Sequence, residues 1–178
     1  MLIKRNTFDL FAISFTALFL ELLIIRWLST EVRIFAYFKN LPLMAAFLGF
    51  GVGCFYYDKS EQLFYRWFPR LIAFLVAIIA LAPKLDITHV IFVDPRQYFL
   101  LGVGFGDHAG SSSVNPLQFA KALTVIVGIF FLVTATFAAL TSKLGELLNR
   151  GSPLAGYSTN VAGSLFGIVS FSVVSYFE

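Results

Sequence analysis

Two charged residues interrupt a long apolar stretch near the N-terminus, and they are the residues most able to do chemistry here. Glu21 and Arg26 lie within residues 8–28, FDLFAISFTALFLELLIIRWL. A charge deep in a membrane helix costs about 3 kcal/mol on insertion scales, so it needs a partner, an interior position or a neutralising proton. The two residues lie about 140° apart around an ideal helix, because each residue turns it by about 100°. They are therefore poorly placed to pair with each other.

Glu21 is the deeper of the two charges, whereas Arg26 can extend its long side chain to the membrane surface. On sequence alone, Lys121, Thr134 and Asn160 are conceivable partners for the Glu21 carboxyl. One interpretation is a carboxylate that handles protons or cations, or that lines a polar pocket. The other is a carboxyl that is satisfied by a hydroxyl or backbone group, or simply protonated.

The elements that must position these side chains are membrane helices. Residues 8–28 are long enough to cross a hydrocarbon core of about 30 Å. Of the whole chain, 58% is hydrophobic and 13% charged, against about 25% charged in soluble domains. The first apolar run is too long for a signal peptide, and no small-residue cleavage site follows it, so we expect an uncleaved span. We expect one transmembrane domain covering residues 1–178.

The predicted fold class is all-α, a polytopic membrane helical bundle of about five transmembrane helices. One long loop, residues 84–116, separates the third and fourth helices, and an amphipathic segment on the membrane surface is expected within residues 58–70. A polar connection is expected at residues 141–157. The predicted spans are residues 8–28, 41–57, 68–82, 117–140 and 157–177.

Small residues mark the expected contacts between helices. Gly49 and Gly53 are four apart in the second span, so they share one helix face and allow a neighbouring backbone to approach closely. The fifth span carries Gly163, Ser164 and Gly167 in the same way. We interpret both groups as helix-packing faces; the alternative for the second span is a substrate or ion passage along that face.

Other motifs do not predict a cofactor or a metal. His89 and His108 lie outside the predicted spans, and the sequence has no paired motif typical of metal or haem ligation. The turn around Gly102, Gly104 and Gly106 is followed by serines and a proline, not by the strand–turn–helix context of a nucleotide site. We expect no cofactor and no metal.

The charge and the single cysteine point to a membrane location and a structural thiol. A net charge of +3, scattered along the chain, does not predict nucleic-acid binding. Cys54 cannot form an internal disulfide and is expected to be an inert packing residue.

Five spans place the termini on opposite sides, and the connections after the second and fourth spans are the more basic for their length. We therefore expect a cytoplasmic N-terminus.

The segment 144–171, LGELLNRGSPLAGYSTNVAGSLFGIVSF, resembles part of the membrane-embedded region of bacterial spermidine synthase-like proteins. In that family a polar loop leads into a helix of the form Y-x-x-N-x-x-G-S-x-x-G. The front of the chain is similar too, in ALFLELLIIRWLS and LMAAFLGFGVGCF. The similar segments occur in the same order as in the family and cover most of the chain. The resemblance implies a multi-pass protein of the bacterial inner (cytoplasmic) membrane. The matching positions in the fifth span are Tyr157, Asn160, Gly163, Ser164 and Gly167.

The departure from that family concerns catalysis. Members that make polyamines carry a soluble aminopropyltransferase domain of about 200 residues, and this sequence has none. No catalytic residue can therefore be carried over, and we do not expect the chain to be an enzyme. The resemblance implies either a detached membrane half of something longer or a membrane-only relative.

Three functional hypotheses follow. The first is a non-catalytic membrane module that lies in the lipid bilayer and assembles with other membrane subunits or with copies of itself. The second is a small transporter or channel-like protein with a polar pathway around Glu21 and Asn160. The third is a membrane enzyme with a site in the loop 94–113. That site would gather Asp94, Arg96, Asp107 and His108.

Overall fold

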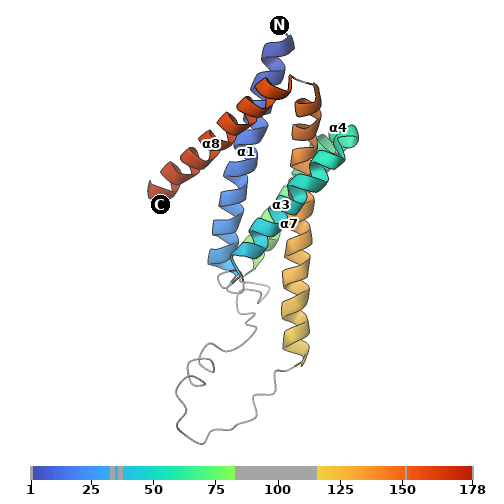
Figure 1. The fold of residues 1–178 in the computed structure, drawn as a ribbon. Coiled ribbons are helices and arrows are strands. Elements are labelled where there is room, and N and C mark those ends of the chain that lie inside the picture. The colour runs from blue at the N-terminus through green and yellow to red at the C-terminus, as the bar shows by residue number, and fades with distance from the viewer. Residues whose placement is uncertain (1, 33–34, 36–37, 83–115, 151, 178) are drawn as a thin grey trace, which may run out of the picture.

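The computed structural model describes residues 2–32, 35, 38–82, 116–150 and 152–177, and nearly all of them are helical (Figure 1). These residues form five long helices, and short helical turns lie between the second and the third of them. The elements are α1 (Leu2–Glu31), α3 (Asn40–Phe55), the 3₁₀ turn η1 (Tyr57–Lys59), α4 (Ser60–Gln62), the π-helical η2 (Leu63–Trp67), α5 (Phe68–Leu81), α7 (Pro116–Arg150) and α8 (Pro153–Phe177).

Within the described residues, four helical segments are long and apolar enough to cross a membrane, which suggests a membrane location. The predicted all-α helical bundle is confirmed for the described part of the chain. The second expected span is shorter than predicted: α3 has 16 residues and measures about 24 Å, less than a hydrocarbon core. The four segments are Asn6–Glu31, Gln62–Leu81, Leu123–Arg150 and Pro153–Phe177.

The polar connection predicted at residues 141–157 is wrong over most of its length, because α7 continues to Arg150. The first two residues of the predicted connection donate hydrogen bonds to carbonyls of the same helix. Thr141 Oγ1 donates to the Phe137 carbonyl at 2.7 Å, and Ser142 Oγ donates to the Ala139 carbonyl at 2.8 Å. Such local bonds let a hydroxyl residue remain in a helix.

The start of the third span also differs from the prediction. The segment expected on the membrane surface is helical from Ser60, and the apolar helix runs from Gln62 rather than from Phe68. A π-helical turn precedes Pro69, with the Phe68 N–H donating to the Leu63 carbonyl five residues back. Proline has no N–H to continue the normal pattern, and a wider turn just before it accommodates that break.

The long loop predicted at 84–116 lies outside the described residues, apart from Pro116 at the start of α7. The residues of the third hypothesis, Asp94, Arg96, Asp107 and His108, lie outside them as well.

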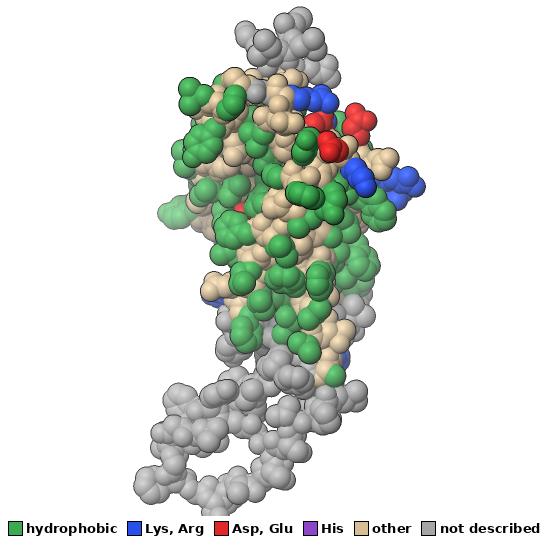
Figure 2. Space-filling view, turned by 45° about the vertical axis from the view of Figure 1, so that its right-hand side comes forward, with side chains coloured by type: hydrophobic (Ala, Val, Ile, Leu, Met, Phe, Trp, Pro, Cys, Tyr) green, Lys and Arg blue, Asp and Glu red, His purple; other side chains and the backbone are tan. Residues whose placement is uncertain are grey.

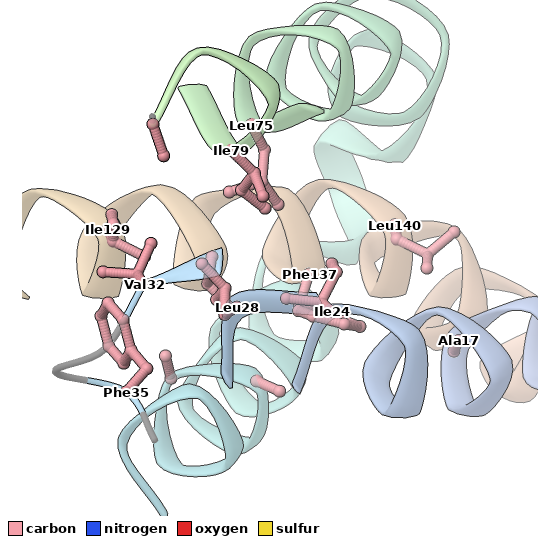
Figure 3. Close-up of a cluster of buried hydrophobic side chains, with 14 residues drawn as sticks. Ala17, Ile24, Leu28, Val32, Phe35, Leu75, Ile79, Ile129, Phe137 and Leu140 are labelled. Atoms are coloured by element: carbon pink, nitrogen blue, oxygen red, sulfur yellow. The ribbon is translucent and has the colours of Figure 1, made fainter. Parts of the chain in front are cut away.

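The main core is formed around α7, where one cluster of buried apolar side chains joins α1, α3, α5 and α7. Figure 3 shows Ile24 and Leu28 of α1 beside Phe137 of α7, with Leu75 and Ile79 reaching in from α5. The most extensive helix pairs are α3 with α7 and α1 with α8. The bundle is thus two tight helix pairs joined through the α1–α7 contact.

The α3–α7 pair is close because α3 presents two glycines to α7. A Cβ added at Gly49 would lie 2.6 Å from the Thr134 carbonyl oxygen, and one at Gly53 would lie 2.5 Å from the Ala138 carbonyl oxygen. Across the same contact, Thr134 Oγ1 donates to the Ala45 carbonyl at 3.2 Å. Backbone contact and interhelical hydrogen bonds of this kind hold membrane helices together.

We expect Gly53→Ala to destabilise the bundle by about 1–3 kcal/mol, because the new methyl group overlaps α7 backbone. Gly51 provides the matched control, since a Cβ there meets nothing within 4 Å. Gly51→Ala should leave stability unchanged or raise it by up to about 1 kcal/mol, through higher helix propensity. Thermal unfolding of both variants in one detergent would measure the difference. Equal losses in the two variants would contradict this account of the contact.

Candidate functional site

One face of α1 has buried residues in a seven-residue repeat between Leu10 and Leu28. Its six positions are spaced alternately four and three apart, the pattern of a left-handed helix packing seam. Two of the six, Ser14 and Glu21, are polar, and they are buried in an otherwise apolar contact. The six are Leu10, Ser14, Ala17, Glu21, Ile24 and Leu28.

Glu21 occupies the middle of this seam, with 3% of the residue exposed. Its Oε2 atom is buried and has no hydrogen-bond partner among the described residues. Of the three conceivable partners, Lys121 is exposed, at the start of α7. The other two are engaged elsewhere: Thr134 Oγ1 lies 2.9 Å from the Phe130 carbonyl and 3.2 Å from the Ala45 carbonyl, and Asn160 contacts another residue of α1.

That other residue is Ser14, two helical turns before Glu21. Its Oγ lies 2.7 Å from Asn160 Oδ1 and 2.8 Å from the Leu10 carbonyl, and it can donate its one proton to either. The contact joins α1 to α8 inside the bundle. The structure therefore brings Asn160 to the α1 seam, but to Ser14 rather than to Glu21.

The glycines of α8 fit against the other side of α1. A Cβ added at Gly163 would lie 2.6 Å from the Phe11 carbonyl oxygen, and one at Gly167 would lie 2.6 Å from the Phe15 carbonyl oxygen. Ser164, between them, is only half-buried. The α1–α8 contact is thus a second backbone-to-backbone approach of the same type as α3–α7.

Arg26 does not pair with Glu21. It is exposed, and its Nη1 donates to Ser175 Oγ near the end of α8. This agrees with the unfavourable spacing of the two residues along α1.

A charged cluster lies at the end of the bundle where α7 finishes and α8 begins. Glu146 is buried and accepts bonds from three side chains: Lys143 Nζ at 2.8 Å, Arg150 Nη2 at 2.7 Å, and the buried Ser60 hydroxyl. Lys143 Nζ also lies 5.9 Å from the centre of the Tyr65 ring, within cation–π range. Figure 2 shows acidic and basic side chains gathered toward this end, above flanks that are largely hydrophobic.

Two cavities open at the same end of the bundle. One, of about 400 Å³, is lined by polar side chains that include Asp58, Glu146 and Asn149. The other, of about 330 Å³, lies between the N-terminal turns of α1 and α8, and Thr7 and Thr159 line it. Glu21 lines neither cavity.

The cluster around Glu146 and the role of Ser14 were missed by sequence reasoning. Lys143, Glu146 and Arg150 are spaced three and four apart, which is the spacing of ion pairs on a helix. That signal was present in the sequence but was read as part of a loop. Ser14 precedes Glu21 by seven residues, so a heptad reading would have put both on one face.

Comparison with protein-family models, with curated protein sequences and with solved structures finds no match to this chain.

We expect Glu146→Ala to lower stability by about 1–3 kcal/mol, because the buried Ser60 hydroxyl and the half-buried Lys143 ammonium both lose their acceptor. Glu61→Ala, at an exposed position near the same end, is the matched control and should change stability little. Denaturant unfolding monitored by circular dichroism would compare them. A loss of the same size in both variants would show that the Glu146 cluster adds nothing specific.

Proposed function

We propose that this chain is a non-catalytic integral membrane module that assembles with another membrane protein, and that α8 makes the contact. The observation that supports this is the position of α8, which packs on α1 and little else in the described chain. Only 11% of its most apolar window is buried. In Figure 1 α8 lies on the outside of the bundle, beside α1.

The outward face of α8 combines large apolar and small polar side chains. Leu165 and Val173 are exposed on it, and so are Ser158 and Ser172. Small and hydroxyl residues are enriched where membrane helices meet, because they permit close approach and hydrogen bonding. The Ser158 and Ser172 hydroxyls already donate within α8, so the contribution of this face to a partner contact is close van der Waals packing at its small residues.

The transporter alternative has less support. A pathway for a solute needs a wet space at its polar centre, and neither of the two described cavities reaches Glu21. The buried side chains beside Glu21 on its own helix, Ala17 and Ile24, are apolar. Assembly with a partner is therefore the function that we propose.

We also propose that the module is related to the membrane-embedded part of bacterial spermidine synthase-like proteins and lies in the bacterial inner membrane. The support is the order of the sequence motifs along the chain, with Asn160 and Gly163 in the last of them. Gly163 and Gly167 of that motif lie at the α1–α8 contact, so the motif coincides with a packing surface.

A bulky residue on the outward face of α8 should disrupt the assembly. Ser172 lies nine positions after Gly163, so it is on the opposite side of α8 from the α1 contact. We expect Ser172→Trp to lower the yield of a co-purifying membrane subunit by roughly tenfold, the effect of about 1.4 kcal/mol in affinity. Ala77→Trp on the exposed face of α5 is the matched control and should leave the yield unchanged. The measurement is quantitative mass spectrometry after purification of the native protein in a mild detergent.

A lone monomeric chain in that purification would overturn the assembly proposal. So would a partner retained equally by Ser172→Trp and the wild type, because it would place the contact elsewhere. If the stoichiometric partner is a second copy of this chain, the module is a homo-oligomer.

The end of the bundle that carries the Glu146 cluster should face the cytoplasm. It holds Lys59, Arg66, Lys143 and Arg150, and short basic connections are retained on that side. In a Cys54→Ser background, we expect Glu61→Cys to resist a membrane-impermeant thiol reagent added to intact cells. Lys39→Cys, at the start of α3, should react. The reverse pattern would show the opposite orientation.

A further inference from the structure

Glu21 is a buried ionisable group that the proposed assembly does not use. It lies at the centre of the α1 seam, and its Oε2 atom has no partner in the described structure. If ionised, the carboxyl would therefore need a partner that the described side chains do not provide.

The helices packed against α1 bring no opposite charge to it. Neither α3 nor α8 contains an acidic, basic or histidine residue. The α7 helix has no charge between Lys121 and Lys143, and α5 has only Arg70, in its first turn. On α1 itself, Arg26 is exposed and donates to α8.

The other titratable groups of these helices are also directed elsewhere. The Cys54 thiol of α3 lies 3.9 Å from the Thr141 carbonyl of α7. Tyr157 and Tyr176 of α8 are exposed, 67% and 84% respectively. Among the described residues, no titratable group therefore offers Glu21 a hydrogen bond or a counter-charge.

An ionised carboxyl at this position would also lack hydrogen bonds from the helix. A carboxylate only accepts hydrogen bonds, and the backbone N–H groups in the middle of an α-helix already bond to carbonyls four residues back. A protonated carboxyl has an O–H to donate, as the hydroxyls of Thr16 and Ser29 do to the carbonyls four residues before them. Burial without a counter-charge favours the same neutral form.

We propose that Glu21 is a proton-binding site inside the bundle, held in its neutral form at physiological pH. Release transfers one proton to water and leaves a carboxylate. This site is independent of the proposed assembly with a partner, because it depends only on contacts within the chain.

Infrared spectroscopy of the protein in lipid nanodiscs tests the protonation state directly. At neutral pH the wild type should show the carbonyl stretch of a protonated carboxylic acid, and Glu21→Gln should lose it. Glu61→Gln, at an exposed position, should keep the band. A wild-type spectrum without a protonated carboxyl would overturn the proposal. A Glu21→Gln chain that fails to fold would also overturn it, because the amide is the neutral isostere of the protonated acid.

Discussion

The close approach of α3 to α7 is the contact on which the rest of the bundle depends. Gly49 and Gly53 have no side chain, so the α3 backbone lies directly against Thr134 and Ala138 of α7. In lipid there is little hydrophobic force between helices, and association comes from tight van der Waals contact and interhelical hydrogen bonds. Once α3 is fixed to one side of α7, the apolar side chains of α1 and α5 can pack around the remainder of that helix.

Lipid has no water to bond to polar groups, and this explains how most polar side chains in the helices form their hydrogen bonds. Thr16, Ser29, Thr136 and Ser172 each donate to the carbonyl four residues before them, so they remain satisfied without water or a partner. Glu21 cannot use that solution while ionised, because a carboxylate has no proton to donate. The absence of a hydrogen-bond partner for its Oε2 atom among the described residues therefore follows from the chemistry of the carboxyl and not from poor packing around it.

The sequence was a good guide to helices and a poor guide to their ends. Apolar composition predicted the all-α bundle, and the start of α8 was placed within a few residues of Pro153. The predicted end of α7 is too early, because the charged residues from Lys143 to Arg150 indicate a polar connection, whereas the helix continues to Arg150. Glu21 was identified because a charge in an apolar run is visible without a structure. Its separation from Asn160 could not be predicted, since it depends on how α8 crosses α1.

The α1 helix connects the two parts of the molecule through different faces. One face carries Glu21 and the seam into the main core, and the other carries the aromatic rings that hold α8, such as Phe11 against Phe166, with ring centres 5.7 Å apart. Ser14 bonds within α1 and contacts Asn160, so it belongs to both contacts. Because α8 is attached mainly to α1, a partner bound to α8 would act on the core through this one helix. The contact of Asn160 with Ser14 is therefore a direct link between α8 and the buried seam.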